Sequence, residues 1–547
     1  MNRVRFIVFI LCSNCVLCVL WYTPIVILKQ GKLRGLRSVS GQRRYYGIPY
    51  AVSERFQPPQ APRTWRGVYK AVHRFGSCAQ AIGFWKLGEE DCHQLDVFTP
   101  EDVKKHDRLP VLVFFHGGAY YYGSKWHYDP EFLVSKNVVV VVVNYRVGVL
   151  GFLCLNNVAN LGLKDQTAAL RWIRENISAF GGDPDNVTIS GQSAGASSAA
   201  MHFLSKSSEG LFHKALLMSG AAIAPWAFNL DPLEPAFEDA AKIGKVKNID
   251  QVYNTLLNAH LPDLLDATAG TSIEPKYFKY SPCVDSNFTE PFFQDAPYNT
   301  IASGTFNKVP VIIGFVDVEG MLFYGLNDRK SLSNLTSDLA NKLPSVFSWC
   351  SQEDRIVIAQ KMHAHYFNNQ KGKAFIDGVV NFYSDWIAYA SIDPFAKLLA
   401  QYSDKPVYSY MFKYEGDRNF AKAFFGGATG LKGASHSDDI FYVFKPGGMS
   451  LLLNNEDKLL IDRWTTMITN FMKYGDPTPK ATSLLPVRWP AITPFSSQVL
   501  QLDHRLSVSE LPAAHRGGLL LDLLCTYGLS GYVPCQSKML CKARQRQ

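Results

Sequence analysis

The stretch NVTISGQSAG, residues 186–195, decides the fold. Residues 186–190 are apolar and β-branched, and the small, helix-compatible residues 196–204 follow the pattern G-x-S-x-G, whose serine is Ser193. A strand, a sharp turn that carries the serine and then a helix form a nucleophile elbow. Gly191 and Gly195 suit this turn because a Cβ would obstruct the close approach of backbone there. The stretch therefore predicts an exposed serine at the end of a strand in an α/β sheet.

The flanking sequence predicts further strands and helices of the same sheet. Residues 109–115 and 137–144 are short, continuously apolar and rich in valine, which is typical of strands buried on both faces of a parallel sheet. Residues 165–180 have apolar side chains at helical spacing, and we expect Asp165 to cap this helix at its N-terminus. Further strands are predicted at 24–31, 309–315 and 407–412. The expected fold class is α/β, with a large central, mostly parallel sheet flanked by helices.

Two helical stretches interrupt the alternation of strands and helices. They cover residues 231–262 and 331–400, and we interpret them as insertions over the C-terminal edge of the sheet. Ligands of open α/β sheets bind at that edge. No internal repeat or long linker divides the chain, so residues 21–547 are expected to form a single domain.

The first residues resemble a targeting segment. Residues 1–20 start with Met-Asn-Arg-Val-Arg and continue almost wholly apolar, which predicts a secretory signal peptide cleaved near residues 18–22. An uncleaved anchor is the alternative because apolar residues continue to Leu28, although Thr23 and Pro24 interrupt them. The C-terminal residues carry neither a retention signal nor a lipid-anchor pattern. We therefore expect a secreted, extracellular protein without a stable membrane anchor.

Composition excludes a nucleic-acid role. The chain has 547 residues, of which 47% are hydrophobic, and its formal net charge is +9. The positive charge is spread over the sequence without a basic stripe or a nucleic-acid-binding motif. The expected partner is a small molecule, and no cofactor or metal is implied.

The cysteines fit an oxidising compartment. Eight of the 11 cysteines lie beyond the leader. Cys78 and Cys92 are close in sequence and separated by a loop-like stretch, which is compatible with a local disulfide. We expect Cys154 and Cys283, in apolar surroundings, to be buried thiols. One bridge is expected among the last three cysteines, with the pairing left open: Cys525, Cys535 and Cys541.

Four sequons are compatible with glycosylation. Those at Asn287 and Asn334 are the better candidates, because Asn176 falls in a predicted helix and Asn186 at a strand start.

Ser193 needs a base and an orienting carboxylate, because a serine hydroxyl is a poor nucleophile. In an elbow fold the acid follows the serine in the sequence and the histidine follows the acid. His436 stands in a polar, glycine-containing loop, and Glu319 follows the predicted strand 309–315. Asp317 and Asp385 are rival acids.

Three other side chains near these candidates receive different roles. We expect Asp438 and Asp439 to cap the following helix, since they lie too close to His436 in sequence to act as its acid. His116 precedes the serine and adjoins Gly117, so we assign it a role in shaping the loop.

An oxyanion hole requires preorganised N–H donors where negative charge develops. Ala194, at the start of the helix after the serine, supplies one candidate donor. Gly117 and Gly118 supply the others, since a glycine lets its N–H face the substrate without a side chain. Together with the pentapeptide they predict an acyl-transfer site.

The sequence resembles the type-B carboxylesterase and cholinesterase group of α/β hydrolases from about residue 24 to 489. The resemblance rests on GIPYA (47–51), RF (55–56), EDC (90–92), NLGLKDQ (160–166), FGGDP (180–184), GLFHKA (210–215) and EG (319–320), with the pentapeptide and His436. It implies a triad of Ser193, Glu319 and His436, an oxyanion hole of Gly117, Gly118 and Ala194, and a Cys78–Cys92 bridge.

Three positions depart from the usual pattern of this group. His93 replaces a leucine and Asp96 an asparagine, which leaves the packing there open. Gln192 stands where cholinesterases carry a glutamate, so the carboxylate that would help to hold a cationic choline group is absent. Glutamine before the serine, and the spacing Gly433-x-x-His436-x-x-Asp439, resemble insect juvenile-hormone-esterase-like members.

The sequence thus predicts a secreted serine hydrolase of neutral, apolar carboxylic esters. Tyr120, Tyr121, Tyr122 and Trp226 are candidates for an apolar pocket wall or, equally, for plain core. The alternative from another class is a catalytically inactive adhesion or binding ectodomain on the same fold. The identity of the ester and the oligomeric state stay open.

Overall fold

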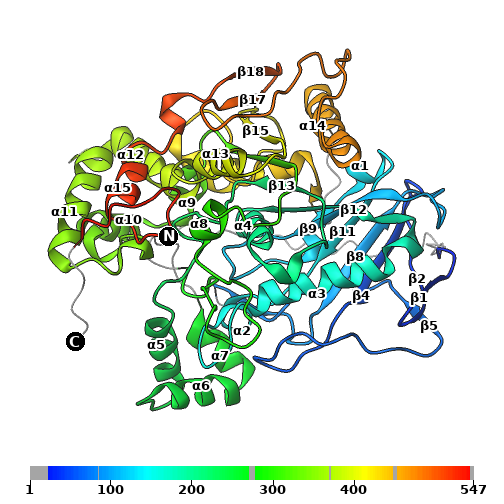
Figure 1. Cartoon of the computed structure of the whole chain (residues 1–547), viewed down its shortest axis with the longest axis horizontal. Coiled ribbons are helices and arrows are strands. Elements are labelled where there is room, and N and C mark those ends of the chain that lie inside the picture. The colour runs from blue at the N-terminus through cyan, green and yellow to red at the C-terminus, as the bar shows by residue number, and fades with distance from the viewer. Residues whose placement is uncertain (1–21, 84, 270–277, 369–370, 447–452, 542–547) are drawn as a thin grey trace, which may run out of the picture.

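An eleven-stranded mixed sheet runs through the computed structural model (Figure 1). Its strand order is β18-β17-β15-β14-β13-β12-β9-β11-β8-β4-β3. All neighbours from β11 to β17 pair in parallel, and β3, β4, β8 and β18 are joined to the edges by antiparallel pairing. The strands are β3 Leu36–Arg37, β4 Arg43–Pro49, β8 Gln94–Thr99, β9 Leu109–Phe115, β11 Val139–Val143, β12 Gly182–Gln192, β13 Lys214–Met218, β14 Val311–Val316, β15 Val407–Phe412, β17 Gln498–Leu502 and β18 Ser507–Glu510.

The structure describes residues 22–83, 85–269, 278–368, 371–446 and 453–541. The signal peptide expected at residues 1–20 lies outside these ranges, and the single domain at 21–547 stays a prediction. Within the described ranges, no helix combines the length and apolar character needed to cross a bilayer.

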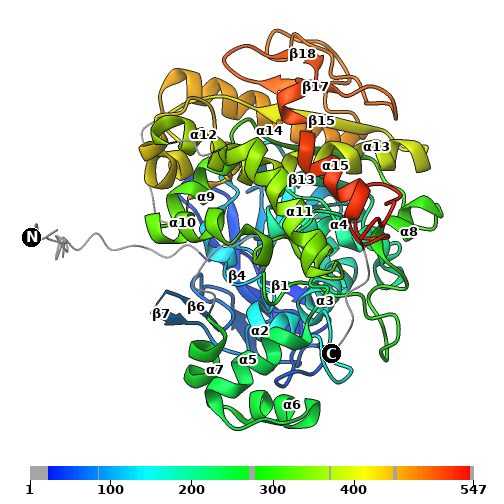
Figure 2. The ribbon, with the colours of Figure 1, turned by 90° about the vertical axis from the view of Figure 1, so that its left-hand side faces the viewer.

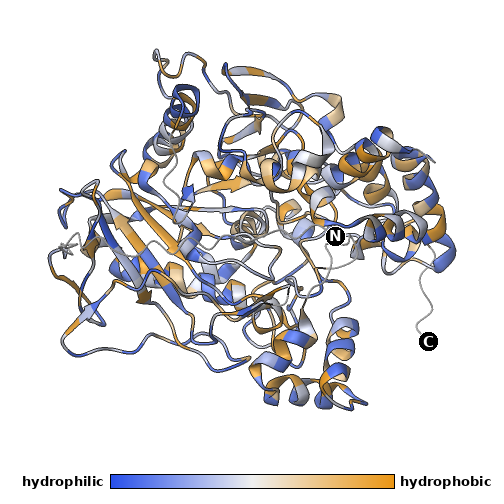
Figure 3. Cartoon of the chain, turned by 180° about the vertical axis from the view of Figure 1, so that it is seen from behind, coloured by the Kyte–Doolittle hydropathy of each residue, from blue (hydrophilic) through white to orange (hydrophobic). Residues whose placement is uncertain are grey.

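Alternate residues of the central strands enter two separate hydrophobic cores. Val111 and Val113 of β9 belong to the larger core, whereas Leu112 and Phe114 belong to the smaller one on the opposite face. The continuous valine run of β11 divides in the same way, which is why both of its faces are apolar. The central strands are accordingly hydrophobic throughout (Figure 3).

Helices cover both faces of the sheet. Leu460, Trp464 and Phe471 of α14 belong to the smaller core, and α3, α4 and α13 contribute to the larger one. The helices are α1 Glu131–Val134, α2 Gly148–Phe152, α3 Leu161–Asn176, α4 Ala194–Met201, α5 Leu233–Ile243, α6 Ile249–Asn258, α7 Leu261–Thr268, α8 Pro297–Ala302, α9 Gly320–Leu326, α10 Arg329–Ser337, α11 Gln352–Met362, α12 Gly372–Ser384, α13 Ile392–Tyr402, α14 Asn455–Tyr474 and α15 Gly518–Tyr527.

The two helical insertions form separate groups. Helices α5, α6 and α7 of the first insertion lie together at one end of the molecule. Helices α10, α11 and α12 of the second lie at another, together with α15 from the C-terminal part of the chain (Figures 1 and 2). Short strands complete the fold: β1 Val26–Leu28, β2 Gly31–Arg34 and β5 Val68–Lys70 form one small sheet, β6 Gln80–Ile82 pairs with β7 Trp85–Leu87, and β10 Tyr128–Asp129 pairs with β16 Lys445–Pro446.

Most predicted elements are confirmed, with shifted boundaries. The strand predicted at 24–31 is instead two short strands outside the central sheet. Helix α3 begins at Leu161, so the expectation that Asp165 caps it is wrong. Asp165 is fully buried inside the helix, and its carboxylate accepts hydrogen bonds from the Arg146 guanidinium at 2.7 and 2.8 Å. Asp165 therefore forms an ion pair with Arg146, although an aspartate is also a residue type that suits a helix cap.

Four disulfides link the eight cysteines. The bonds are Cys78–Cys92, Cys154–Cys283, Cys350–Cys541 and Cys525–Cys535. The expectation that Cys154 and Cys283 are free buried thiols is wrong, because the fold brings their Cα atoms to 6.5 Å across 129 residues of sequence. Apolar surroundings do not distinguish a buried thiol from a buried disulfide, whereas this distance does.

Candidate active site

Ser193 lies on the sharp turn between β12 and α4. Its φ is +57° and its ψ is −126°, a backbone conformation that residues other than glycine rarely adopt. The N–H of Ser193 donates to the carbonyl of Met218 on neighbouring β13 at 2.8 Å, which ties the turn to the sheet. Backbone strain of this kind persists only where surrounding structure holds it, and it clusters at functional sites. This is the geometry of the predicted nucleophile elbow.

The glycines around the turn leave no room for a side chain. A Cβ on Gly191 would lie 2.2 Å from the backbone of Gly195, and one on Gly195 would lie 2.1 Å from the carbonyl of Phe115. A Cβ on Gly220 would lie 2.4 Å from the carbonyl of Ser193. Sequence analysis missed Gly220, because nothing local marks it; its role depends on β13 lying beside the elbow.

Four hydrogen bonds hold the loop that carries His436, one between backbone groups and three to aspartate side chains. Val318 N–H donates to the carbonyl of Ala434 at 3.1 Å, and Asp317 Oδ1 accepts from Ala434 N at 2.7 Å. Asp438 Oδ2 accepts from Ser435 N at 2.7 Å, while its Oδ1 accepts from Ala421 N at 2.9 Å. His436 as a whole is 2% exposed. The loop therefore presents a buried ring in one fixed orientation.

Glu319 pairs with His436 directly. Its Oε2 bonds Nδ1 of His436, and its Oε1 accepts a hydrogen bond from Val316 N at 3.0 Å. The carboxylate is wholly closed to solvent. A buried carboxylate on Nδ1 makes Nε2 the proton-accepting nitrogen of the neutral ring, which is the arrangement of a general base and its orienting acid.

The rival acids serve other partners. Asp317 holds the His436 loop through Ala434, and burial raises the pKa of its carboxyl to about 7. Asp385 bonds the hydroxyl of Tyr366 at 2.5 Å, and burial raises the pKa of Asp385 to about 6. Neither carboxylate contacts His436.

The prediction that Asp438 and Asp439 cap the next helix is wrong. The short 3-10 helix Asp439–Tyr442 has no side-chain cap. Asp438 accepts the loop hydrogen bonds described above, and Asp439 accepts from the hydroxyl of Tyr410 at 2.7 Å. Both carboxylates therefore accept from donors other than the N–H groups of the helix that follows them.

Of the predicted oxyanion-hole residues, Gly117 and Ala194 lie beside Ser193, and Gly118 follows Gly117 in the loop. A Cβ on Gly117 would lie 2.6 Å from the carbonyl of Gln192 and 3.2 Å from Cβ of Ser193. Gly118 has a φ of +114°, which favours glycine. Among the described residues, no acceptor takes the N–H of Gly117 or Gly118. Ala194 is the first residue of α4, whose N-terminal N–H groups lack partners within the helix. Three donors are therefore available for a developing negative charge.

Buried polar contacts hold the loop that carries these glycines. The ring of His116 stacks on Tyr145 at 4.3 Å, and its Nδ1 lies 2.9 Å from the carbonyl of Gly117. Burial lowers the pKa of His116 to about 4, so the ring is neutral at pH 7. At the other end of the loop, the amide of Gln80 bonds both the N–H and the carbonyl of Gly123, at 2.8 and 3.0 Å. These contacts support the loop-shaping role predicted for His116.

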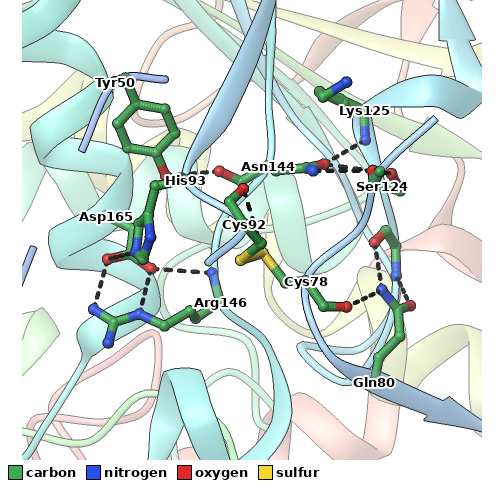
Figure 4. The surroundings of a disulfide bond; sticks show 12 residues. Tyr50, Cys78, Gln80, Cys92, His93, Ser124, Lys125, Asn144, Arg146 and Asp165 are labelled. Atoms are coloured by element: carbon green, nitrogen blue, oxygen red, sulfur yellow. Dashed lines mark hydrogen bonds and ion pairs between the residues drawn. A yellow bond between two sulfur atoms is a disulfide. The ribbon is translucent and has the colours of Figure 1, made fainter. Parts of the chain in front are cut away.

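The two unusual residues, His93 and Asp96, have complementary partners. His93 Nε2 lies 3.1 Å from Oδ1 of Asp165, beside the Cys78–Cys92 disulfide (Figure 4). Burial raises the pKa of Asp165, but Arg146 and His93 outweigh that effect and hold it below its ordinary value. Asp96 pairs with Lys125 at 2.8 Å. His93 and Asp96, whose packing the sequence left open, thus each belong to a buried polar cluster.

A row of aromatic rings leads away from His436. Phe323 lies 5.2 Å from the His436 ring, centroid to centroid, and Trp386 lies 6.5 Å from Phe323. Phe278 stacks on Trp386 at 5.7 Å and contacts Trp226 at 5.5 Å. Of these rings, sequence analysis singled out Trp226 alone, because no local motif marks the others. All four rings are buried members of the larger core, so the row is an apolar packing layer that reaches His436.

The predicted tyrosines divide between core and surface. Tyr120 is fully buried and packs on Phe152 and Trp226. The hydroxyl of Tyr121 accepts from Tyr280 N at 3.3 Å. Tyr122 is 37% exposed. Tyr120 is therefore core, as is Trp226, to which it packs.

Comparison with known proteins identifies the family. A model described as "Carboxylesterase family" matches residues 22–517. The juvenile hormone esterase of Tribolium castaneum is 32% identical over 83% of this chain and 84% of its own length. Esterase FE4 of Myzus persicae is 31% identical over 92% of this chain and 95% of its own length. Neuroligin-2 of Mus musculus is 30% identical over 83% of this chain and 60% of its own length.

A solved structure agrees with the sequence comparisons. The juvenile hormone esterase of Manduca sexta, with OTFP covalently attached, superposes with a TM-score of 0.81 at 27% identity, over 91% of this chain and 98% of that one. The fold is that of an α/β hydrolase, and the enzyme class is carboxylic ester hydrolase. The chain belongs to the carboxylesterase family.

Proposed function

We propose that this protein hydrolyses neutral, apolar carboxylic esters through an acyl-enzyme formed on Ser193. The observation that carries the proposal is the bond between the buried Glu319 carboxylate and Nδ1 of His436. Nε2 of the same ring lies 3.2 Å from the amide of Gln192, the residue before Ser193 on the strained elbow. A buried carboxylate on Nδ1 and a serine on an elbow serve acyl transfer in many hydrolases.

The proposed reaction has two halves. Ser193 Oγ attacks the ester carbonyl while Nε2 of His436 takes its proton, and the N–H groups of Gly117, Gly118 and Ala194 hold the oxyanion. His436 then returns the proton to the leaving alcohol oxygen, and the bond between carbonyl carbon and that oxygen breaks. Water attacks the acyl-enzyme in the second half, again losing its proton to His436, and the carboxylic acid leaves as Ser193 regains its hydrogen. Glu319 stays ionised and orients the ring.

Two features support a neutral, apolar substrate. The row from Phe323 to Trp226 places apolar rings beside the base, in place of charged groups. Gln192, next to the nucleophile, is uncharged at any pH. The similarity to two juvenile hormone esterases makes juvenile hormone the first specific substrate to test.

The protein is proposed to be secreted and glycosylated. The four disulfides fit an oxidising compartment. Asn287 and Asn334 are exposed, whereas Asn176 is buried and its amide donates to the carbonyl of Trp172. Glycans are therefore expected on Asn287 and Asn334, and a mass decrease after enzymatic deglycosylation, absent from the double Asn→Gln variant, tests both.

The decisive experiment compares Ser193→Ala with Ser190→Ala. Ser190 is a buried serine three residues earlier whose hydroxyl has no partner among the described residues, so its loss leaves no group unpaired. We expect Ser190→Ala to hydrolyse short nitrophenyl esters like the wild type and Ser193→Ala to lose this activity. A panel of short, long-chain and choline esters with juvenile hormone then ranks the substrates.

Covalent labelling separates catalysis from the alternative binding role. An organophosphate is expected to label Ser193 in the wild type and in Ser190→Ala. Absence of labelling, with absence of esterase activity, would favour a non-catalytic binding protein instead.

A further inference from the structure

Gln192 contacts the catalytic base. It is the last residue of β12 and 5% exposed, and its Nε2 lies 3.2 Å from Nε2 of His436. On its other side, a Cβ on Gly117 would lie 2.9 Å from Oε1 of Gln192. The amide thus lies between the base and the glycine loop.

The direction of this hydrogen bond follows from Glu319. Its carboxylate bonds Nδ1 of His436, so the proton of the neutral ring is on Nδ1 and Nε2 carries the lone pair. The Gln192 amide nitrogen can only donate. The contact therefore exists with the neutral ring alone: once Nε2 is protonated, two N–H groups face each other and the bond is lost.

The other charged groups around the ring are carboxylates. Glu319 faces it from the turn before α9, and Asp439 faces it from the 3-10 helix after the loop. Phe323 of α9 covers part of the ring without charge, and Asp438 turns away to Ser435 and Ala421. Both facing carboxylates favour a protonated ring. The hydrogen bond from Gln192 favours the neutral ring instead.

We propose that Gln192 is a positioning residue that holds His436 in its neutral, proton-accepting form and thereby extends esterase activity to lower pH. This inference rests on the proposed function of Ser193 and His436. During acylation, Ser193 Oγ–H displaces the amide from the Nε2 lone pair. Between turnovers the amide returns and keeps the ring oriented.

The test is the pH profile of Gln192→Glu. Glutamate is of similar size but presents an acceptor that pairs with a protonated ring. We expect the acid limb of its kcat/KM profile to move upward by about one pH unit, while the high-pH plateau stays within about tenfold of the wild type. Gln192→Met, which keeps the length without a donor, is expected to shift the limb in the same direction by less and to lower kcat more than it changes KM.

A matched control makes the same change beside another histidine. Gln166 Oε1 lies 3.0 Å from Nε2 of His202, away from the site, so Gln166→Glu is expected to leave the acid limb unmoved. The rate of organophosphate labelling of Ser193 against pH gives a second readout that needs no turnover. It is expected to shift with Gln192→Glu in the same way.

The outcomes separate this inference from the proposed function. Superimposable acid limbs for wild type and Gln192→Glu, in both assays, would overturn the role of Gln192 while leaving the esterase intact. An inert wild type that no organophosphate labels would instead overturn the proposed function itself.

Discussion

Nζ of Lys125 lies 2.8 Å from Oδ1 of Asp96, and both side chains are closed to solvent. The backbone N–H of Lys125 also donates to Oδ1 of Asn144 at 2.8 Å, and the Asp96 carboxylate accepts from Gly47 N at 2.7 Å. The pair therefore joins strand β8 to the end of the loop that begins at Gly117. Burial raises the pKa of Asp96, although Lys125 opposes that effect.

Removing the cation of this pair is expected to destabilise the fold. Lys125→Met leaves a buried carboxyl without its partner, which costs about 3–5 kcal/mol. The double variant Lys125→Met/Asp96→Asn removes both charges, and it is expected to recover at least half of that loss. Urea unfolding of the three proteins measures both effects. Equal stability of Lys125→Met and wild type would contradict the structural role of the pair.

Gly117→Ala is expected to reduce catalysis while the protein stays folded. The new Cβ would lie 2.6 Å from the Gln192 carbonyl, so the N–H proposed to hold the oxyanion must move. Loss of one such donor reduces kcat by roughly 10²–10³-fold. Gly76→Ala is the control, because the nearest atom to its Cβ is 3.5 Å away. Nitrophenyl ester kinetics with circular dichroism check the prediction, and an unchanged kcat would remove Gly117 from the oxyanion hole.

The identity of the acid is tested by amide substitutions. Glu319→Gln removes the charge that orients His436, and we expect kcat to fall by about 10³-fold or more. Asp317→Asn keeps an oxygen that accepts from Ala434 N, so its activity is expected to stay within a few fold of the wild type. The opposite ranking in steady-state kinetics would make Asp317 the acid.

Stability is expected to fall in acid because of a buried histidine. Burial lowers the pKa of His202 to about 3, between Ser208 Oγ at 2.7 Å and Gln166 Oε1 at 3.0 Å. The unfolded chain binds this proton below about pH 6.5 and the folded protein does not, so the stabilisation present above pH 6.5 is lost as pH falls toward 3. The slope from one such group approaches about 1.4 kcal/mol per pH unit. Thermal unfolding between pH 4 and 7 should be less pH-dependent in His202→Gln, and an identical dependence would refute this assignment.

The Cys154–Cys283 disulfide is expected to stabilise more than Cys525–Cys535. The former closes 129 residues and the latter 10. In the chain-entropy model these loops correspond to about 5 and about 3 kcal/mol. Denaturant unfolding of the two double Cys→Ala variants gives the comparison. A larger loss for Cys525→Ala/Cys535→Ala would show that loop entropy is not the dominant contribution.

The sequence by itself determined the fold class and the residues that form the elbow. The apolar runs that become β9 and β11 are uninterrupted because each strand is buried on both faces, and such runs are recognisable without neighbours. The order Ser193, Glu319, His436 likewise predicts the contact between His436 and Glu319 that the structure contains. Their catalytic roles stay predictions.

The tertiary structure alone decided which distant residues meet. Asp165 suits a helix cap by type, but Arg146 occupies its carboxylate, and Cys154 joins Cys283 because the fold closes the chain between them. The contact of Gln192 with His436 spans 244 residues, and no local pattern encodes it. Periodicity and motifs indicate whether a segment must be buried or exposed. They do not specify which distant residues contact it, because those contacts depend on the packing of the whole chain. That packing brings the amide of Gln192 to the base.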